Sequence, residues 1–108
     1  MIKTRISEEA LQRIKATLQK TYGDRFKGVV LYGSEARGDA REDSDIDLLV
    51  LLAGPVVFGD EIQTIIDAIY PIQLEVDRIV SVRPADIAVY ERGEFPFYRN
   101  VKEEGVLL

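Results

Sequence analysis

The chain opens with a helical pattern of apolar residues. Four of them lie three or four positions apart and would share one side of a helix: Leu11, Ile14, Leu18 and Tyr22. Ser7 precedes the pattern and suits the N-cap position, while Glu8 and Glu9 would lie near the positive end of the helix dipole. We therefore expect a helix that packs one apolar stripe on a core and ends before Gly23.

Three later segments have the pattern of strands. Residues 26–32 are apolar and partly β-branched, and they predict a strand that stops at Gly33. The segment from Asp45 to Leu52 carries acids only at its start and predicts a second, buried strand. A third strand is expected over residues 73–82, where Leu74, Val76 and Val80 alternate with polar residues.

Turn signals place further helices around these strands. One is expected from about Val57 to Tyr70, with Pro71 beyond its end and four inward isoleucines: Ile62, Ile65, Ile66 and Ile69. Pro84 suits the first turn of a short helix to about Glu91, and Pro96 that of another to about Glu104. The alternation predicts the α/β (α+β) class, with a small mixed β-sheet, helices packed on one face, and a single domain over residues 1–108.

The composition and net charge exclude several classes of protein and of active site. The formal net charge of −5 argues against a broad nucleic-acid surface, which needs a basic face. The absence of cysteine and histidine excludes thiolate sites and a Ser-His-Asp triad, so carboxylates and metal remain. No apolar run reaches the roughly 20 residues of a membrane span, and Met1–Arg5 lacks the apolar core of a signal peptide. We expect a cytoplasmic protein.

The most informative motif joins a small-residue turn to two acids. Gly33 lets the backbone approach an anion closely, and the Ser34 hydroxyl adds a donor beside the amides of the next helical turn. After ten intervening residues, Asp45 and Asp47 share one face of a strand. Two carboxylates at the start of an apolar strand repel each other unless a cation lies between them, and Mg²⁺ suits such ligands. The alternative is that both acids are simply solvated at a strand end.

These residues resemble the signature of the minimal nucleotidyltransferases of the polymerase-β superfamily. The match covers nine positions: Gly33, Ser34, Ala36, Arg37, Gly38, Ser44, Asp45, Asp47 and Leu48. Residues 76–80 are similar to the family's later strand with the third catalytic acid, which would be Asp77, and residues 97–105 are similar to its closing segment. Glu75 would lie on the same strand face as Asp77 and is the competing third acid.

The resemblance implies nucleotidyl transfer from ATP, assisted by two Mg²⁺ ions held by Asp45, Asp47 and Asp77. Such a pair of metals stabilises the attacking and leaving oxygens of an in-line displacement. The phosphates are expected to be held by Gly33 and Ser34. Arg37 is expected either to join them or, with equal weight, to form an ion pair on the surface. No base-binding pocket is identifiable from the sequence.

The family's minimal members include antitoxins that transfer AMP to a tyrosine of a partner HEPN-type helical toxin, and this is the leading functional hypothesis. Two alternatives stay open. One is transfer to a small hydroxylated molecule, and the other is a non-catalytic antitoxin that acts by contact. Oligomeric state is left open. Phe95, Phe97 and Tyr98 are expected to pack on the sheet, with a partner-facing patch as the alternative.

Overall fold

A computed structural model describes residues 6–108, so the expectation for Met1–Arg5 lies outside the described residues. The elements follow in this order: α1 Glu8–Tyr22, a 3-10 turn at Gly23–Arg25, β1 Phe26–Tyr32, α2 Gly33–Arg37, β2 Ile46–Leu52, α3 Phe58–Gln73, β3 Val80–Asp86, α4 Ile87–Arg92, α5 Pro96–Glu104 and β4 Val106–Leu107. In the described part of the chain, no helix is both long and apolar enough to cross a membrane.

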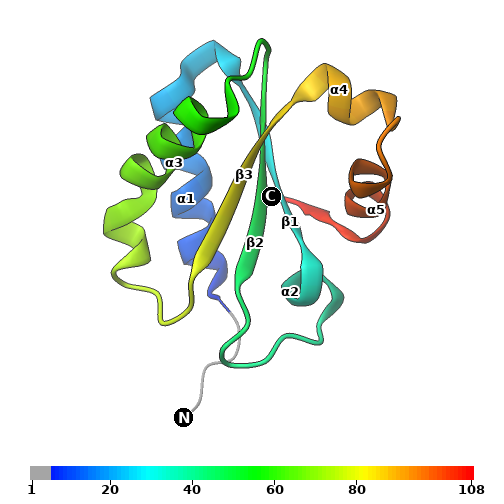
Figure 1. Cartoon of the computed structure of the whole chain (residues 1–108). Helices are drawn as coiled ribbons and strands as arrows, with labels where there is room; N and C mark the ends of the chain where they lie inside the picture. Colours follow the sequence, from blue (N-terminus) through cyan, green and yellow to red (C-terminus); the bar gives the residue numbers. More distant parts are fainter. Residues whose placement is uncertain (1–5) are drawn as a thin grey trace.

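The strands form one mixed sheet in the order β3-β2-β1-β4 (Figure 1). β1 pairs with β2 and with β4 in antiparallel fashion, whereas β2 and β3 are parallel. In this register Asp47 lies between Tyr32 on β1 and Ser81 on β3. The edge strand β3 contains Pro84, whose missing N–H is tolerated at a sheet edge.

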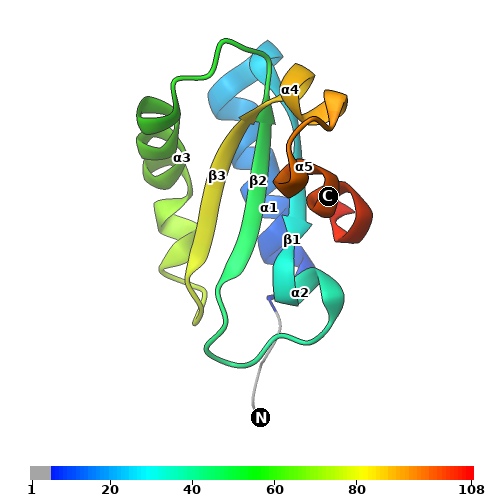
Figure 2. The same ribbon diagram turned by 45° about the vertical axis from the view of Figure 1, so that its right-hand side comes forward.

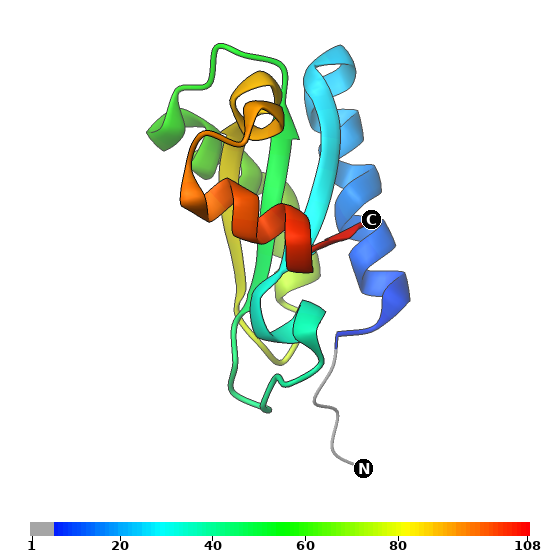
Figure 3. The same ribbon diagram turned by 90° about the vertical axis from the view of Figure 1, so that its right-hand side faces the viewer.

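Helices cover both faces of the sheet. α1 and α3 lie side by side on one face, which we call the first face, and α4 and α5 lie on the other, the second face (Figures 1, 2 and 3). The first face buries the larger core, in which Ile14, Leu18 and Ile65 are fully enclosed. A smaller core on the second face joins Leu49 and Leu51 to Tyr90 of α4 and Val101 of α5.

The expected α/β class and the small mixed sheet are confirmed, but helices pack on both faces of the sheet and not on one face only. The Ser7 cap is present, since its hydroxyl accepts a hydrogen bond from the Ala10 amide at 3.1 Å. Leu11, Ile14 and Leu18 are buried as expected, and the strand over residues 26–32 ends at Gly33. Pro96 opens α5, which reaches Glu104.

The expected strand over residues 73–82 is wrong. α3 continues through Pro71 to Gln73, and β3 begins only at Val80. The Gln73 side chain explains the shift, because it donates to the Arg78 carbonyl at 2.8 Å and accepts from the Val80 amide at 2.7 Å. These two bonds hold residues 74–79 as a bend between helix and strand.

Two smaller expectations also fail. Pro84 does not open a helix, because β3 runs to Asp86 and the Asp86 carboxylate caps α4 by accepting from the Ala88 amide at 2.9 Å. In α3 the buried isoleucines are Ile65, Ile69 and Ile72, whereas Ile66 is 43% exposed. The buried stripe of α3 therefore continues to Ile72, which belongs to the helix because α3 extends past Pro71.

Candidate active site

Asp45 and Asp47 lie where β2 begins, on the second face of the sheet. Asp47 is half-buried and points to the same side as Leu49 and Leu51, which belong to the second-face core. Asp45 is exposed just before the strand, and its charge lies close enough to act on Asp47. The structure therefore brings these two predicted acids together, as the alternation of the strand requires.

Gly33 is where β1 turns into α2, and the Asp47 carboxylate lies directly against it. Its φ of 75° belongs to the left-handed region that favours glycine. A Cβ atom built at this position would overlap the Asp47 Oδ2 atom. The absence of a side chain at Gly33 thus makes room for an acid of the site, which is a second reason for glycine beside the close approach of an anion.

The surroundings of Asp47 disfavour its charged form. Burial and, second, the neighbouring Asp45 charge raise the pKa of Asp47, while Arg37 and Arg78 act in the opposite direction. The same carboxylate contributes to the raised pKa of Tyr32, whose main cause is burial. A divalent cation between Asp45 and Asp47 would remove this repulsion.

The motif residues of α2 lie beside the acids. Ser34 is half-buried in the first turn, and its carbonyl accepts from the amides of Gly38 at 3.0 Å and Asp39 at 3.1 Å. Arg37 is paired with Asp39 at 3.4 Å and with Glu104 of α5 at 3.2 Å. Arg37 thus has the surface ion pairs that the sequence left open, and its side chain is 46% exposed.

A buried ion pair that the sequence did not reveal fixes α2 against the sheet. Arg78 donates to the Glu35 carboxylate at 2.6 Å and to the Ser44 carbonyl at 2.7 Å. Both side chains of the pair are nearly inaccessible, and Glu35 also accepts from the Ile6 amide at 3.3 Å. Arg78 therefore ties the bend before β3 to the motif helix and to the start of β2.

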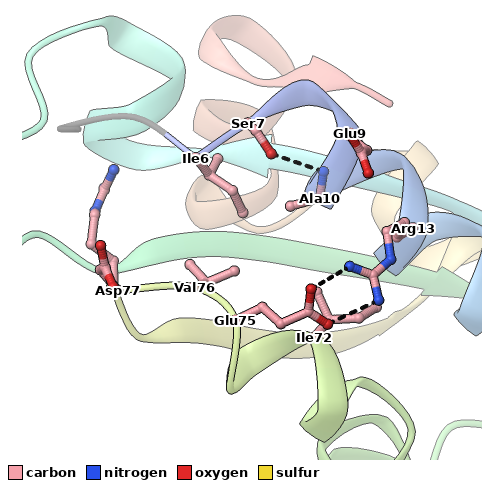
Figure 4. Close-up of a pocket in the computed structure, with 10 residues that line it drawn as sticks. Ile6, Ser7, Glu9, Ala10, Arg13, Ile72, Glu75, Val76 and Asp77 are labelled. Carbon is pink, nitrogen blue, oxygen red and sulfur yellow. Dashed lines mark hydrogen bonds and ion pairs between the residues drawn. The ribbon is translucent and has the colours of Figure 1, made fainter. Parts of the chain in front are cut away.

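Asp77 and Glu75, the two candidates for the third acid, lie elsewhere. Both line a cavity of about 330 Å³ between the start of α1 and the end of α3, on the first-face side (Figure 4). Glu75 turns to Arg13, which donates two hydrogen bonds at 2.9 and 3.1 Å, and this pairing lowers the pKa of Glu75. Among residues 6–108 no three acidic side chains cluster as a metal site. The structure does not gather Asp77 with Asp45 and Asp47.

The position beside Asp47 on β3 belongs to Ser81, and Arg83 follows two residues later on the same face. The sequence did not single out either residue. The parallel register that brings them to the site depends on the start of β3, which the misplaced strand had put seven residues too early.

The structure thus places two carboxylates beside a glycine turn at one end of a mixed sheet. A family model described as a nucleotidyltransferase domain matches residues 11–108, which is most of the chain. The chain therefore belongs to the nucleotidyltransferase domain family.

Its relatives make the class more particular. The chain is 33% identical over 101 residues to a Methanocaldococcus jannaschii protein named "Putative protein adenylyltransferase MJ0604", covering 94% of this chain and 96% of that protein. A second protein of that organism, with the same description and the designation MJ0141, is 39% identical over 44 residues, or 41% of this chain and 44% of its own length.

Among solved structures, the chain resembles one chain of a crystal structure of the toxin-antitoxin pair MntA-HpeT that carries a tyrosine-to-alanine mutation. The TM-score is 0.58 at 17% identity, covering 96% of this chain and 72% of the matched chain. This likeness shows a shared fold.

Proposed function

We propose that the protein transfers AMP from ATP to a hydroxyl acceptor and requires Mg²⁺. The observation that carries the proposal is the pair Asp45 and Asp47 held against Gly33, in a chain of the nucleotidyltransferase domain family. The family and the 33% identical relative MJ0604, whose name describes a putative protein adenylyltransferase, support this choice of donor.

The acids fit a divalent cation. They are two carboxylates near each other at the start of a strand. Burial and, second, the Asp45 charge raise the pKa of Asp47, and a bound cation would oppose both effects by favouring the charged carboxylate. Mg²⁺ is bound by one or two carboxylates together with water and substrate phosphate oxygens. When bound, the metal would neutralise charge that develops on the transferring phosphoryl group. A complement of two ions stays a prediction, as does the role of Asp77 as a third ligand.

The protein's own groups divide the remaining tasks. Ser34 and the amides after Gly33 would hold the outer phosphates, since they open a helical turn next to the acids. Arg37 would reach a phosphate only by releasing Asp39 or Glu104, which are its present partners. The Glu35–Arg78 pair takes no part in the chemistry and keeps α2 at a fixed distance from β2.

For the acceptor we propose a tyrosine of a partner toxin of the HEPN type, which would make the protein an antitoxin that acts by AMPylation. The fold shared with an antitoxin–toxin pair and the name of MJ0604 favour a protein acceptor.

The test is an incubation of the protein with ATP labelled on the α-phosphate, Mg²⁺ and the product of the neighbouring gene. We expect label on the partner protein, no label when EDTA replaces Mg²⁺, and a loss of about 100-fold or more in Asp45→Asn and Asp47→Asn. Asp43→Asn, an exposed acid of the same loop, is the matched control and keeps the activity. Absence of label on any protein or small acceptor would refute the proposed transfer.

Asp77→Asn and Glu75→Gln decide the third acid. Loss of transfer in Asp77→Asn would mean that the bend before β3 rearranges when ATP binds, because the described position faces the α1 side. Retained transfer in both variants would assign the chemistry to Asp45 and Asp47 alone.

Two other outcomes would indicate a different function. Label on a small hydroxylated compound without any partner protein would indicate a small-molecule transferase. Full neutralisation of the toxin by a variant with Asp45 and Asp47 both changed to Asn would indicate an antitoxin that acts by contact.

A further inference from the structure

A second cavity lies on the second face of the sheet and is not used by the groups described so far. It measures about 300 Å³ and is lined by Arg83, Val89, Phe95, Phe97 and Tyr98. Tyr98 packs on the second-face core as expected, whereas Phe95 is 53% exposed and Phe97 39%. We call this space, between β3 and the helices α4 and α5, the aromatic cavity.

The aromatic cavity begins beside the acids. Arg83 pairs with Leu49, two residues beyond the pairing of Ser81 with Asp47, and it lies on the same face about 7 Å further along the strands. On the other side of Asp47, the ring of Tyr32 meets the ring of Phe97 edge to face at 5.5 Å. The cavity therefore lies on the same face of the sheet as Asp47, two residue pairs further along β2 and β3.

The lining has the chemistry that recognises a nucleobase. The Arg83 guanidinium lies over the Phe97 ring at 5.2 Å, and Phe97 contacts Tyr98 at 5.6 Å, so the ring is supported from two sides. An exposed aromatic face stacks on bases, and a guanidinium donates to the ring nitrogen acceptors that purines carry.

We infer that the aromatic cavity is the subsite for the purine base of the donor nucleotide, with the base stacked on Phe97 and hydrogen-bonded by Arg83. This assignment rests on the proposed function, since it takes the α-phosphate to lie at Asp45 and Asp47. The triphosphate then lies toward Ser34 in the first turn of α2, and the base lies toward Phe97 in the first turn of α5.

Calorimetric titration of the whole chain with ATP and with inorganic tripolyphosphate, both with Mg²⁺, tests the assignment. Phe97→Leu is expected to weaken ATP binding about 5- to 150-fold, the range for one stacked base, and to leave tripolyphosphate binding unchanged. Phe58→Leu is the matched control, because Phe58 is 49% exposed and also lies under Arg83, at 5.7 Å, but does not line the cavity. It keeps both affinities.

Arg83→Gln gives a second measurement if Phe97→Leu fails to fold, since Arg83 is an exposed residue. We expect it to weaken ATP and GTP more than CTP. Wild-type affinity for ATP in both variants would overturn the assignment, and so would an equal loss for ATP and tripolyphosphate.

The two proposals fail in different ways. If the wild-type protein binds ATP but transfers no AMP, the proposed function fails while the effect of Phe97→Leu on the ATP-to-tripolyphosphate ratio still decides the cavity. If transfer occurs and Phe97→Leu leaves the KM for ATP unchanged, the cavity assignment fails alone. A wild-type protein that binds neither compound overturns both.

Discussion

Breaking the buried Glu35–Arg78 pair should cost more stability than any exposed ion pair of the protein. The Arg78 and Glu35 side chains are 4% and 2% accessible and 2.6 Å apart. Removing one partner of a buried pair costs about 3–5 kcal/mol, because the other charge stays buried and loses the attraction of this pair. A chain of 108 residues has a total stability of roughly 5–16 kcal/mol, so either single change removes a large share of it.

The assay is a double-mutant cycle with Glu35→Leu, Arg78→Met and the double variant, measured by urea unfolding with tyrosine fluorescence and circular dichroism. The double variant should lose less than the sum of the single losses, with a coupling energy of about 2 kcal/mol or more, because it leaves neither charge buried. Strictly additive losses, or single losses below about 1 kcal/mol, would refute the reasoning.

The exposed pair Arg13–Glu75 is the control for this cycle. It has two hydrogen bonds at 2.9 and 3.1 Å, but both side chains are largely exposed. Solvent screens such a pair, so Glu75→Gln should give no resolvable loss at neutral pH. A loss as large as that of Arg78→Met would show that burial is not the cause.

Three further predictions concern single residues. Gly33→Ala should lower the free energy of unfolding by about 1–2 kcal/mol because of the left-handed backbone, and it should abolish transfer by displacing Asp47. Gly38→Ala is the control, since Gly38 has a φ of 84° and open space around it. It should lower the free energy of unfolding by the same amount and keep the activity. Asp47→Asn should stabilise the metal-free protein by up to about 1 kcal/mol in thermal unfolding. Because the folded pKa of Asp47 is raised, this gain is present above that pKa and vanishes as the pH falls through it, so a gain that grows in acid would contradict the assignment. Ser7→Ala should lower stability by about 0.5–2 kcal/mol through loss of the cap, and an unchanged urea midpoint would speak against the cap.

The sequence predicted those features that depend on local pattern. Alternation put Asp45 and Asp47 on one face, and the stripe of Leu11, Ile14 and Leu18 fixed the buried side of α1, because both follow from the geometry of a single element. The start of β3 could not be predicted in this way. It depends on the Gln73 side chain and on the buried Arg78, whose contacts join segments that only the folded chain brings together.

The same distinction holds for the residues of the candidate site. Gly33, Ser34 and the two acids were recognisable because their spacing follows one strand, one turn and the next strand. Ser81 and Arg83 were not, since only the register between β2 and β3 places them beside Asp47 and Leu49. An edge strand that begins with a bend gives no periodic signal for its register.

Pro84 has a consequence for the behaviour of the protein at high concentration. It interrupts the row of backbone donors along the outer edge of β3, where another chain would otherwise add a strand. Edge-to-edge growth into fibrils is therefore blocked at this strand without any covering helix. Replacing this one imino acid by threonine would restore the donor and open a route to aggregation.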